Sequence, residues 1–335
     1  MSEPEGREFG PLQGLRVIEM GQLLAGPFVG TRCADFGAEV IKIEPPGTGD
    51  PIRNWGRNQY QGKTLWWPIM ARNKHSVSAD LRHPRGQALV RKLIETADVL
   101  IENFKPGTLE KWDMSPERLH RINPGLVIVR VSGFGQTGPY ASRPGFASVG
   151  EAMSGLRYIN GYPDMPPPRF GISLGDTLTA LFAFEGMMMA LFRRDRNGGQ
   201  GQVVDAAITE SCFAMLESCV TEFSKTGHVR KPSGSGLAKI APSNIYPTSD
   251  AGYVDPPEPA DSYIWLQSGD ARFYSTLLVN ANLQLMSDSD EPLDFHLYHY
   301  RAQSAAGTIR SKRDGALIVR VPNTFEEDDL DPQQN

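Results

Sequence analysis

The hydrophobic positions of this chain form short apolar runs separated by longer segments with helical periodicity. The strand-like runs are 15–19, 39–44, 76–81, 98–102 and 126–132. Helical segments lie between them; one extends from 28 to 36, and another begins at Pro84 and continues to about Thr96. Strands that alternate with helices in this way predict a parallel sheet covered by helices. We therefore expect a doubly wound, Rossmann-like α/β fold for the large domain.

A second pattern centres on residues 171–194, where one carboxylate precedes a long apolar segment. Apolar side chains recur at near-helical spacing from Leu178 to Leu191 and cover more than one face, which predicts a well-buried helix starting just after Asp176. The positive end of the helix dipole favours a carboxylate there, and Gly175 lets another molecule approach the backbone. Asp176 is therefore either the N-cap of this helix or a nucleophile.

The sequence after residue 200 predicts where the domains begin and end. A strand at 203–207 and an amphipathic helix at 209–223 precede a Gly-, Ser- and Lys-rich stretch at 231–239, which is typical of a domain boundary. The domains expected from the sequence are a large α/β domain that carries Asp176 at 11–230, the start of a small second domain at 231–320, and a disordered acidic end at 321–335. A strand is expected at 273–285.

The amino-acid composition argues against several classes of binding partner. The net charge of −5, without a basic face, argues against nucleic acid. Three cysteines with no CxxC pair predict no metal site and indicate a reducing compartment. The first ten residues lack the apolar region of a signal peptide, and the apolar run 178–192 is interrupted by Glu185 and is shorter than a bilayer span. We expect a cytoplasmic protein with no membrane partner; a mitochondrial or peroxisomal location is the alternative in a eukaryote.

A nicotinamide-dinucleotide site is one hypothesis for the first strand-helix-strand unit. Glu44 ends the second strand, where a ribose-binding acid would lie. However, the turn at 21–27 has neither the glycines of GxGxxG nor the Lys-Ser/Thr of a phosphate loop. An NAD-dependent oxidoreductase is therefore disfavoured.

Seven motifs together resemble the class III CoA-transferase family (CaiB/BaiF, formyl-CoA transferase-like). They are LRVIEMGQLLAGPFVGTRCADFGAEVIKIEPPGTGDPIR, ARNKHSVSADL, DVLIENFKPGTLEKW, GFGQTGPYASRPGF, LGDTLTA, GGQGQVVDAAI and APSNIYPT, in family order over residues 11–250. The resemblance implies an enzyme that moves CoA from an acyl-CoA donor to a small carboxylic acid. It also implies that Asp176 attacks the thioester and carries covalent aspartyl intermediates. No tightly bound cofactor or metal is implied, because the coenzyme A thioester is the substrate.

The same resemblance assigns CoA contacts by matched position. Leu24 and Ala25 match the lining of the thioester arm, and the run Arg143, Pro144, Gly145 and Phe146 matches the backbone near the 3′-phosphate. The remaining matches are Ala79, Asp80, Leu81 and Arg82 for adenine and ribose, and Asn103, Phe104, Lys105 and Lys111 around the nucleotide and pantetheine. The phosphates of CoA call for Lys and Arg, which four of these positions supply.

Departures from the family pattern keep other functions open. Racemases of the family use a histidine in a GHD-like motif, but the matching run Gly145-Phe146-Ala147 has no imidazole or carboxylate, which favours a transferase. Many transferases also carry an acid at the position of Ala147. The resemblance makes 11–230 a large CoA-binding domain that carries the nucleophile. From about Ala251 the family pattern ends, so the small second domain at 231–320 is expected to be incomplete or altered, with a divergent tail. The alternatives are a non-catalytic CoA-binding paralogue, a truncated product or an acyl-CoA racemase; a homodimer is expected if the C-terminal region permits it.

Overall fold

The computed structural model describes residues 10–236 and six short strands further along the chain, at 243–244, 265–268, 275–278, 295–299, 303–310 and 317–320. The chain divides into two compact units. One consists of Met1–Ile159 and Pro168–Arg230, and the other of Asn160–Pro167 and Lys231–Asn335. The acidic end predicted at 321–335 lies outside the described residues.

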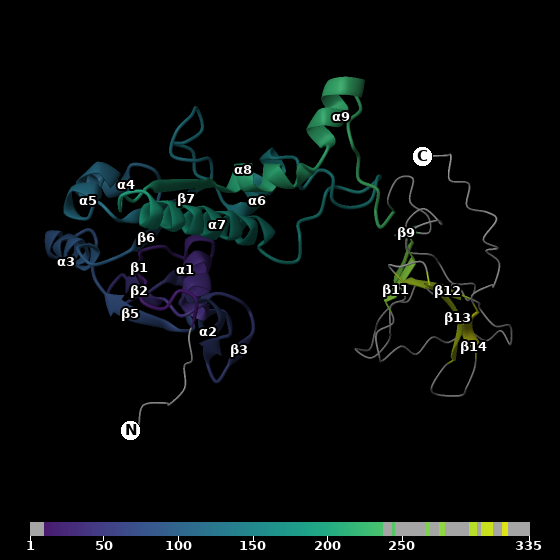
Figure 1. Cartoon of the computed structure of the whole chain (residues 1–335), viewed down its shortest axis with the longest axis horizontal. Coiled ribbons are helices and arrows are strands. Elements are labelled where there is room, and N and C mark those ends of the chain that lie inside the picture. The colour runs from purple at the N-terminus through teal and green to yellow at the C-terminus, as the bar shows by residue number, and fades with distance from the viewer. Residues whose placement is uncertain are drawn as a thin grey trace. The chain divides into compact units, whose positions relative to one another are not determined.

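The first unit is built on six parallel strands in the order β5-β2-β1-β6-β7-β8, of which Figure 1 labels β5, β2, β1, β6 and β7. They are β1 (Arg16–Glu19), β2 (Glu39–Glu44), β5 (Lys74–Ser78), β6 (Val99–Glu102), β7 (Val127–Ser132) and β8 (Val203–Ala207). Counted along the parallel sheet alone, the order is 3-2-1-4-5-6, so the predicted doubly wound, Rossmann-like fold is confirmed. The strand order reverses between β1 and β6, and a crevice opens at the carboxyl ends of these two strands.

Helices cover both faces of this sheet. They are α1 (Ala25–Asp35), α2 (Trp66–Ala71), α3 (Pro84–Ile94), α4 (Thr108–Lys111), α5 (Pro116–Ile122), α6 (Ala147–Met153), α7 (Leu174–Arg196), α8 (Ile208–Phe213) and α9 (Cys219–Thr226). Helices α1 and α7 share a buried cluster with Val17 and Val129, whereas α3, α4 and α5 share one with Ile18 and Ile128. Because neighbouring strand residues point to opposite faces, both surfaces of each central strand are buried.

Helix α7 departs from the sequence prediction in two ways. It begins at Leu174, so Asp176 is its third residue and not its N-cap. It is also 23 residues long, and by length and composition it is apolar enough to cross a membrane. The prediction of a shorter apolar run was wrong because the helix continues past that run at both ends. Its buried face, which includes Ala183 and Met187, packs in the sheet core, while Met189 and Phe192 on the other face are exposed.

Two other helix predictions also needed correction. Helix α1 begins at Ala25, inside the predicted turn, because Pro27 is tolerated in a first turn whose N–H groups have no partners. The helix predicted at 209–223 is divided into α8, a 3-10 turn (Ala214–Leu216) and α9. The break falls at Glu217, whose φ of 51° is incompatible with a right-handed helix.

Short elements complete the described part of the chain. In the first unit, a 3-10 turn (Pro51–Asn54) precedes a small hairpin of β3 (Gln59–Tyr60) and β4 (Lys63–Thr64). In the second unit, two antiparallel sheets have the orders β11-β10-β9 and β12-β13-β14. Their strands are β9 (Ser243–Asn244), β10 (Trp265–Ser268), β11 (Ser275–Leu278), β12 (Phe295–His299), β13 (Gln303–Arg310) and β14 (Leu317–Arg320). Strand β11 lies within the strand predicted at 273–285.

Candidate active site

A pocket of about 370 Å³ lies at the carboxyl edge of the parallel sheet, where the strand order reverses. Its walls come from the loops after β1, β6 and β7, from the segment before α6, and from the first turns of α7 and α8. The lining residues are Gln22, Leu23, Leu24, Ala25, Trp55, Asn103, Phe104, Lys105, Pro106, Val131, Ser132, Gly133, Arg143, Pro144, Gly145, Phe146, Asp176 and Ile208. The fold therefore brings together segments that are up to 186 positions apart in the sequence, between Gln22 and Ile208.

Close backbone contact assembles one wall of the pocket. The loop after β7 crosses the segment before α6 so tightly that a Cβ added at Gly133 would lie 2.7 Å from the Cα of Gly145. Any side chain at either position would force the two segments apart. These glycines therefore explain how the predicted run 143–146 reaches the same pocket as Asp176.

Asp176 is the acid of this pocket. It is half-buried in the first turn of α7 and lines the cavity. Burial and, to a smaller extent, the negative charge of Glu151 together raise the pKa of its carboxyl from 3.8 to about 6. A carboxylate with a raised pKa is more basic than an ordinary surface carboxylate, which suits it to attack an electrophilic carbon.

Glu151 is a neighbouring acid that the sequence analysis missed. It belongs to α6, is only 3% exposed, and its Oε1 accepts a hydrogen bond of 3.0 Å from the N–H of Gly175. It lies one helical turn after Ala147, the position at which many members of the resembled family carry an acid. A charged residue in the otherwise small and apolar segment 147–156 was the available signal.

Several predicted CoA contacts do line the pocket. They are Leu24, Ala25, Asn103, Phe104, Lys105, Arg143, Pro144, Gly145 and Phe146. Asn103 also fixes the loop after β1, because its side-chain amide donates to the carbonyl of Gln22 and accepts from the N–H of Gln22, each at 2.8 Å. Within the described residues, Lys105 and Arg143 have no carboxylate within 4.0 Å, so two cations without acidic partners lie at this pocket.

The other predicted contacts lie outside the pocket lining. Residues 79–82 follow β5, two strands from β1 and therefore roughly 10 Å further along the same sheet edge. Ala79 and Leu81 face a core cluster, and Asp80 accepts the N–H of Arg82 at 3.0 Å. Lys111 ends α4. The roles of Ala79, Asp80, Leu81, Arg82 and Lys111 in binding the nucleotide stay predictions.

The part of the chain that the structure describes contains no cluster of side chains suited to bind a metal ion. No group of three or more His, Cys, Asp or Glu side chains converges there in a way that could hold an ion. The charged side chains that line the pocket are the carboxylate of Asp176 and the cations of Lys105 and Arg143.

The raised pKa of Asp176 predicts that this residue destabilises the fold at neutral pH. A carboxyl group whose folded-state pKa lies above its unfolded value binds its proton more tightly in the folded state. The stability of the fold therefore decreases as the pH rises from 3.8, the unfolded pKa, to about 6, the folded pKa. Asp176→Asn is expected to raise the free energy of unfolding at pH 7 by up to about 3 kcal/mol. Chemical denaturation at pH 7 and pH 3 checks this, because at pH 3 the gain must disappear; an equal gain at both pH values contradicts it.

The fold and the pocket define a Rossmann-like α/β protein whose ligand site, with one carboxylate and two cations, lies at the switch point of its sheet, where the strand order reverses. A sequence model described as CoA-transferase family III matches residues 12–255. The chain belongs to this family.

Known proteins resemble the chain over most of its length. The succinyl-CoA–D-citramalate CoA-transferase of Chloroflexus aurantiacus is 58% identical over 243 residues, which are 72% of the chain and 60% of the relative. The succinate–glutarate CoA-transferase of Agrobacterium fabrum is 39% identical over 246 residues, 72% of the chain and 61% of the relative. A crystal structure of a CAIB/BAIF family protein from Brucella suis has a TM-score of 0.70 and 35% identity, covering 78% of the chain and 67% of that protein. The chain thus spans about 60% of the length of these curated relatives.

Proposed function

We propose that this protein transfers CoA from an acyl-CoA to a small carboxylic acid, with Asp176 as the covalent nucleophile. The observation that carries the proposal is the position of the Asp176 carboxylate in a switch-point pocket, with the start of α1 on one side and two cations, Lys105 and Arg143, nearby. The names of the relatives support the same reaction class.

The chemistry needs only carboxylates and the thiolate of CoA. Asp176 attacks the thioester carbonyl and expels CoA thiolate, which leaves a mixed anhydride on Asp176. The thiolate attacks the aspartyl carbonyl and releases the donor acid, leaving an aspartyl-CoA thioester. The acceptor carboxylate then attacks this thioester, and the released thiolate attacks the acyl carbon of the second anhydride. The new acyl-CoA leaves, and the Asp176 carboxylate is restored.

Each of these attacks forms a tetrahedral oxyanion, and α1 offers donors for it. The N–H groups of Ala25 and Gly26 open α1 and have no acceptor inside the helix. Ala25 lines the pocket. We assign these backbone N–H groups the stabilisation of the oxyanion, a task that needs preorganised donors away from bulk water.

The cations define the expected substrate class. Lys105 and Arg143 suit either a phosphate of CoA or the second carboxylate of a dicarboxylic acid. Because the relatives are named for succinyl-CoA, citramalate, succinate and glutarate, we propose a short dicarboxylyl-CoA as donor and a short dicarboxylic acid as acceptor.

Mass spectrometry of the purified full chain tests the proposal. Trypsin cleaves after Arg169 and Arg193, so the peptide 170–193 carries Asp176. After incubation with succinyl-CoA and rapid acid quenching, we expect this peptide to carry the mass of an acyl or CoA adduct, with fragment ions placing it on Asp176 and not on Glu185.

The control is the Asp176→Asn chain treated in the same way. It must give the unmodified peptide while still binding CoA in a titration. An adduct on another residue, or none on a folded wild-type chain that binds CoA and is tested with a panel of short acyl-CoAs, would contradict covalent catalysis by Asp176.

A further inference from the structure

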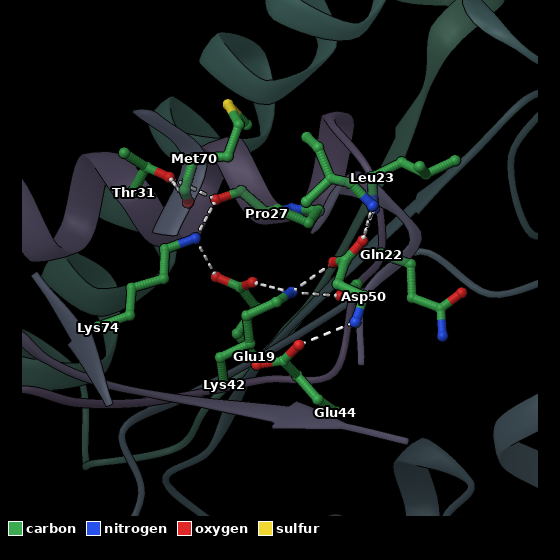
Figure 2. Close-up of polar contacts among 12 residues, drawn as sticks. Glu19, Gln22, Leu23, Pro27, Thr31, Lys42, Glu44, Asp50, Met70 and Lys74 are labelled. Carbon is green, nitrogen blue, oxygen red and sulfur yellow. Dashed lines mark hydrogen bonds and ion pairs between the residues drawn. The ribbon is translucent and has the colours of Figure 1, made fainter. Parts of the chain in front are cut away.

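Four charged side chains form a buried quartet beside the pocket: Glu19 on β1, Lys42 on β2, Asp50 before the first 3-10 turn, and Lys74 on β5 (Figure 2). Their side chains are at most 2% exposed. The Nζ of Lys42 lies 2.7 Å from Oε1 of Glu19 and 2.8 Å from Oδ2 of Asp50, and the Nζ of Lys74 lies 2.7 Å from Oε2 of Glu19. With all four groups ionised, two ammonium groups and two carboxylates balance to zero charge, although burial lowers the pKa of Lys74.

This arrangement is a costly way to stabilise a fold. Removing four charges from water carries a desolvation penalty that their mutual attraction offsets only with good geometry, and apolar side chains often fill such space equally well. Burial acts to lower the pKa of Lys42, but the carboxylates of Glu19 and Asp50 outweigh it and raise the pKa overall, so Lys42 stays charged. The quartet therefore calls for a role besides stability.

Its outward contacts indicate that role. The Nζ of Lys42 donates to the carbonyl oxygen of Gly21 at 2.9 Å, and Oδ1 of Asp50 accepts the N–H of Leu23 at 3.1 Å. Between these two contacts, the Asn103 amide holds both backbone groups of Gln22. Three consecutive residues of the loop after β1 are thus held by side chains from other parts of the chain, as Figure 2 shows for Leu23.

The loop needs such support because its backbone is strained. Leu23 has a φ of 64°, in the left-handed region that a branched apolar residue rarely adopts. Leu24 follows as the N-cap residue of α1 and offers no side-chain hydrogen bond to the helix. Without the contacts to Gly21 and Leu23, relaxation of Leu23 would move Leu24 and the first N–H groups of α1, which form one wall of the pocket.

We propose that Lys42 and Asp50 are positioning residues. They hold the loop Gly21–Leu24, and with it the start of α1, in the conformation that orients the acyl-CoA thioester toward Asp176. Glu19 and Lys74 complete the charge balance that allows Lys42 and Asp50 to be buried. This inference rests on the proposed function for its kinetic consequence, although the contact itself is tested independently below.

The test compares Asp50→Asn with a control variant, Asp98→Asn, in the full chain. Asp98 also forms an ion pair, with Arg194 at 2.9 Å, and also accepts a backbone N–H, that of Arg16 at 2.8 Å. Its side chain is 25% exposed, against 1% for Asp50, and it precedes the amino end of β6, whereas the pocket lies at the carboxyl ends of the strands. The measurements are the unfolding midpoint, the Kd for CoA, and the rate of adduct formation on Asp176 in a single turnover with succinyl-CoA.

Asp50→Asn is expected to slow adduct formation by about 10- to 100-fold at a temperature at which the variant is fully folded, because a displacement of about 1 Å is enough for such a loss. The Kd for CoA should change by less than about 3-fold, which is under 1 kcal/mol, because Lys105 and Arg143 do not belong to the displaced loop. Asp98→Asn should lower the unfolding midpoint and leave the rate within about 2-fold, as expected for a site without contact to the pocket. Equal rate losses in both variants, or a wild-type rate in folded Asp50→Asn, overturn the proposal.

Amide hydrogen exchange in the wild-type chain keeps the inference falsifiable if Asp50→Asn does not fold. The Leu23 N–H, bonded to the buried Asp50, must exchange slowly without any ligand; rapid exchange overturns the proposal. A wild-type chain that forms no adduct refutes the proposed function, and slow exchange at Leu23 would then still establish the held loop.

Discussion

Asp176→Asn is expected to reduce CoA exchange between succinyl-CoA and a dicarboxylic acid by at least about 10³-fold, because an amide cannot form the anhydride and removal of a covalent nucleophile is among the largest single losses in enzymes. The Kd for CoA should stay within a few-fold, since the pocket walls are unchanged. The exchange is followed by chromatography of the acyl-CoA products.

Asp195→Asn is the matched control for this substitution. Asp195 belongs to the last turn of the same helix, is exposed, and pairs only with the adjacent Arg194 at 2.8 Å among the described residues. The control should exchange CoA at the wild-type rate. Turnover in Asp176→Asn within about tenfold of wild type would assign the chemistry to another group.

The rate of adduct formation on Asp176 should fall steeply in acid. The attacking form is the ionised carboxylate, whose pKa is raised to about 6 by burial and by Glu151. As pH falls through 6, the proton binds and the rate drops about tenfold per pH unit, to about one hundredth of the plateau at pH 4. Single-turnover rates between pH 4 and 8, on chain shown to be folded at each pH, provide the check. A pH-independent rate over this range is incompatible with the expectation.

Glu151→Gln separates the two causes of that raised pKa. The amide oxygen can still accept the Gly175 N–H, but the negative charge beside Asp176 is removed. The acid limb of the profile should therefore shift to lower pH, while the plateau rate above pH 7 stays within about 3-fold. An unshifted limb would assign the pKa to burial alone.

Local periodicity was sufficient to predict the central sheet. Each parallel strand before residue 140 overlaps a predicted strand, and the alternation with helices implied the doubly wound order. The agreement is poorest at β5, which begins at Lys74 and ends at Ser78 whereas the predicted strand was 76–81, because its sequence KHSVS is mostly polar. Periodicity is less informative at element ends. The start of α1 at Ala25 and the break at Glu217 depend on backbone conformations that side-chain hydrophobicity does not encode.

The residues of the site likewise fall into those that local sequence motifs predicted and those that they did not. Asp176 and nine other residues that line the pocket were found because they lie in short motifs with a family resemblance, whereas lining residues such as Trp55, Ser132 and Ile208 were not predicted. Glu151, Lys42 and Asp50 were not found. Lysine and the acidic residues are exposed in most proteins, so their burial here follows from which strands become neighbours, a long-range property that no local segment contains.

The buried quartet also constrains how this sequence can change over time. Loss of any one of its four charges leaves a net charge enclosed in the sheet unit, whereas a balanced pair, such as Glu19 with Lys74, can be replaced by apolar residues together. Homologous sequences should therefore vary at these positions in correlated pairs. Because three of the four charges come from β1, β2 and β5, a folding intermediate that lacks β5 would leave Oε2 of Glu19 without its partner Lys74.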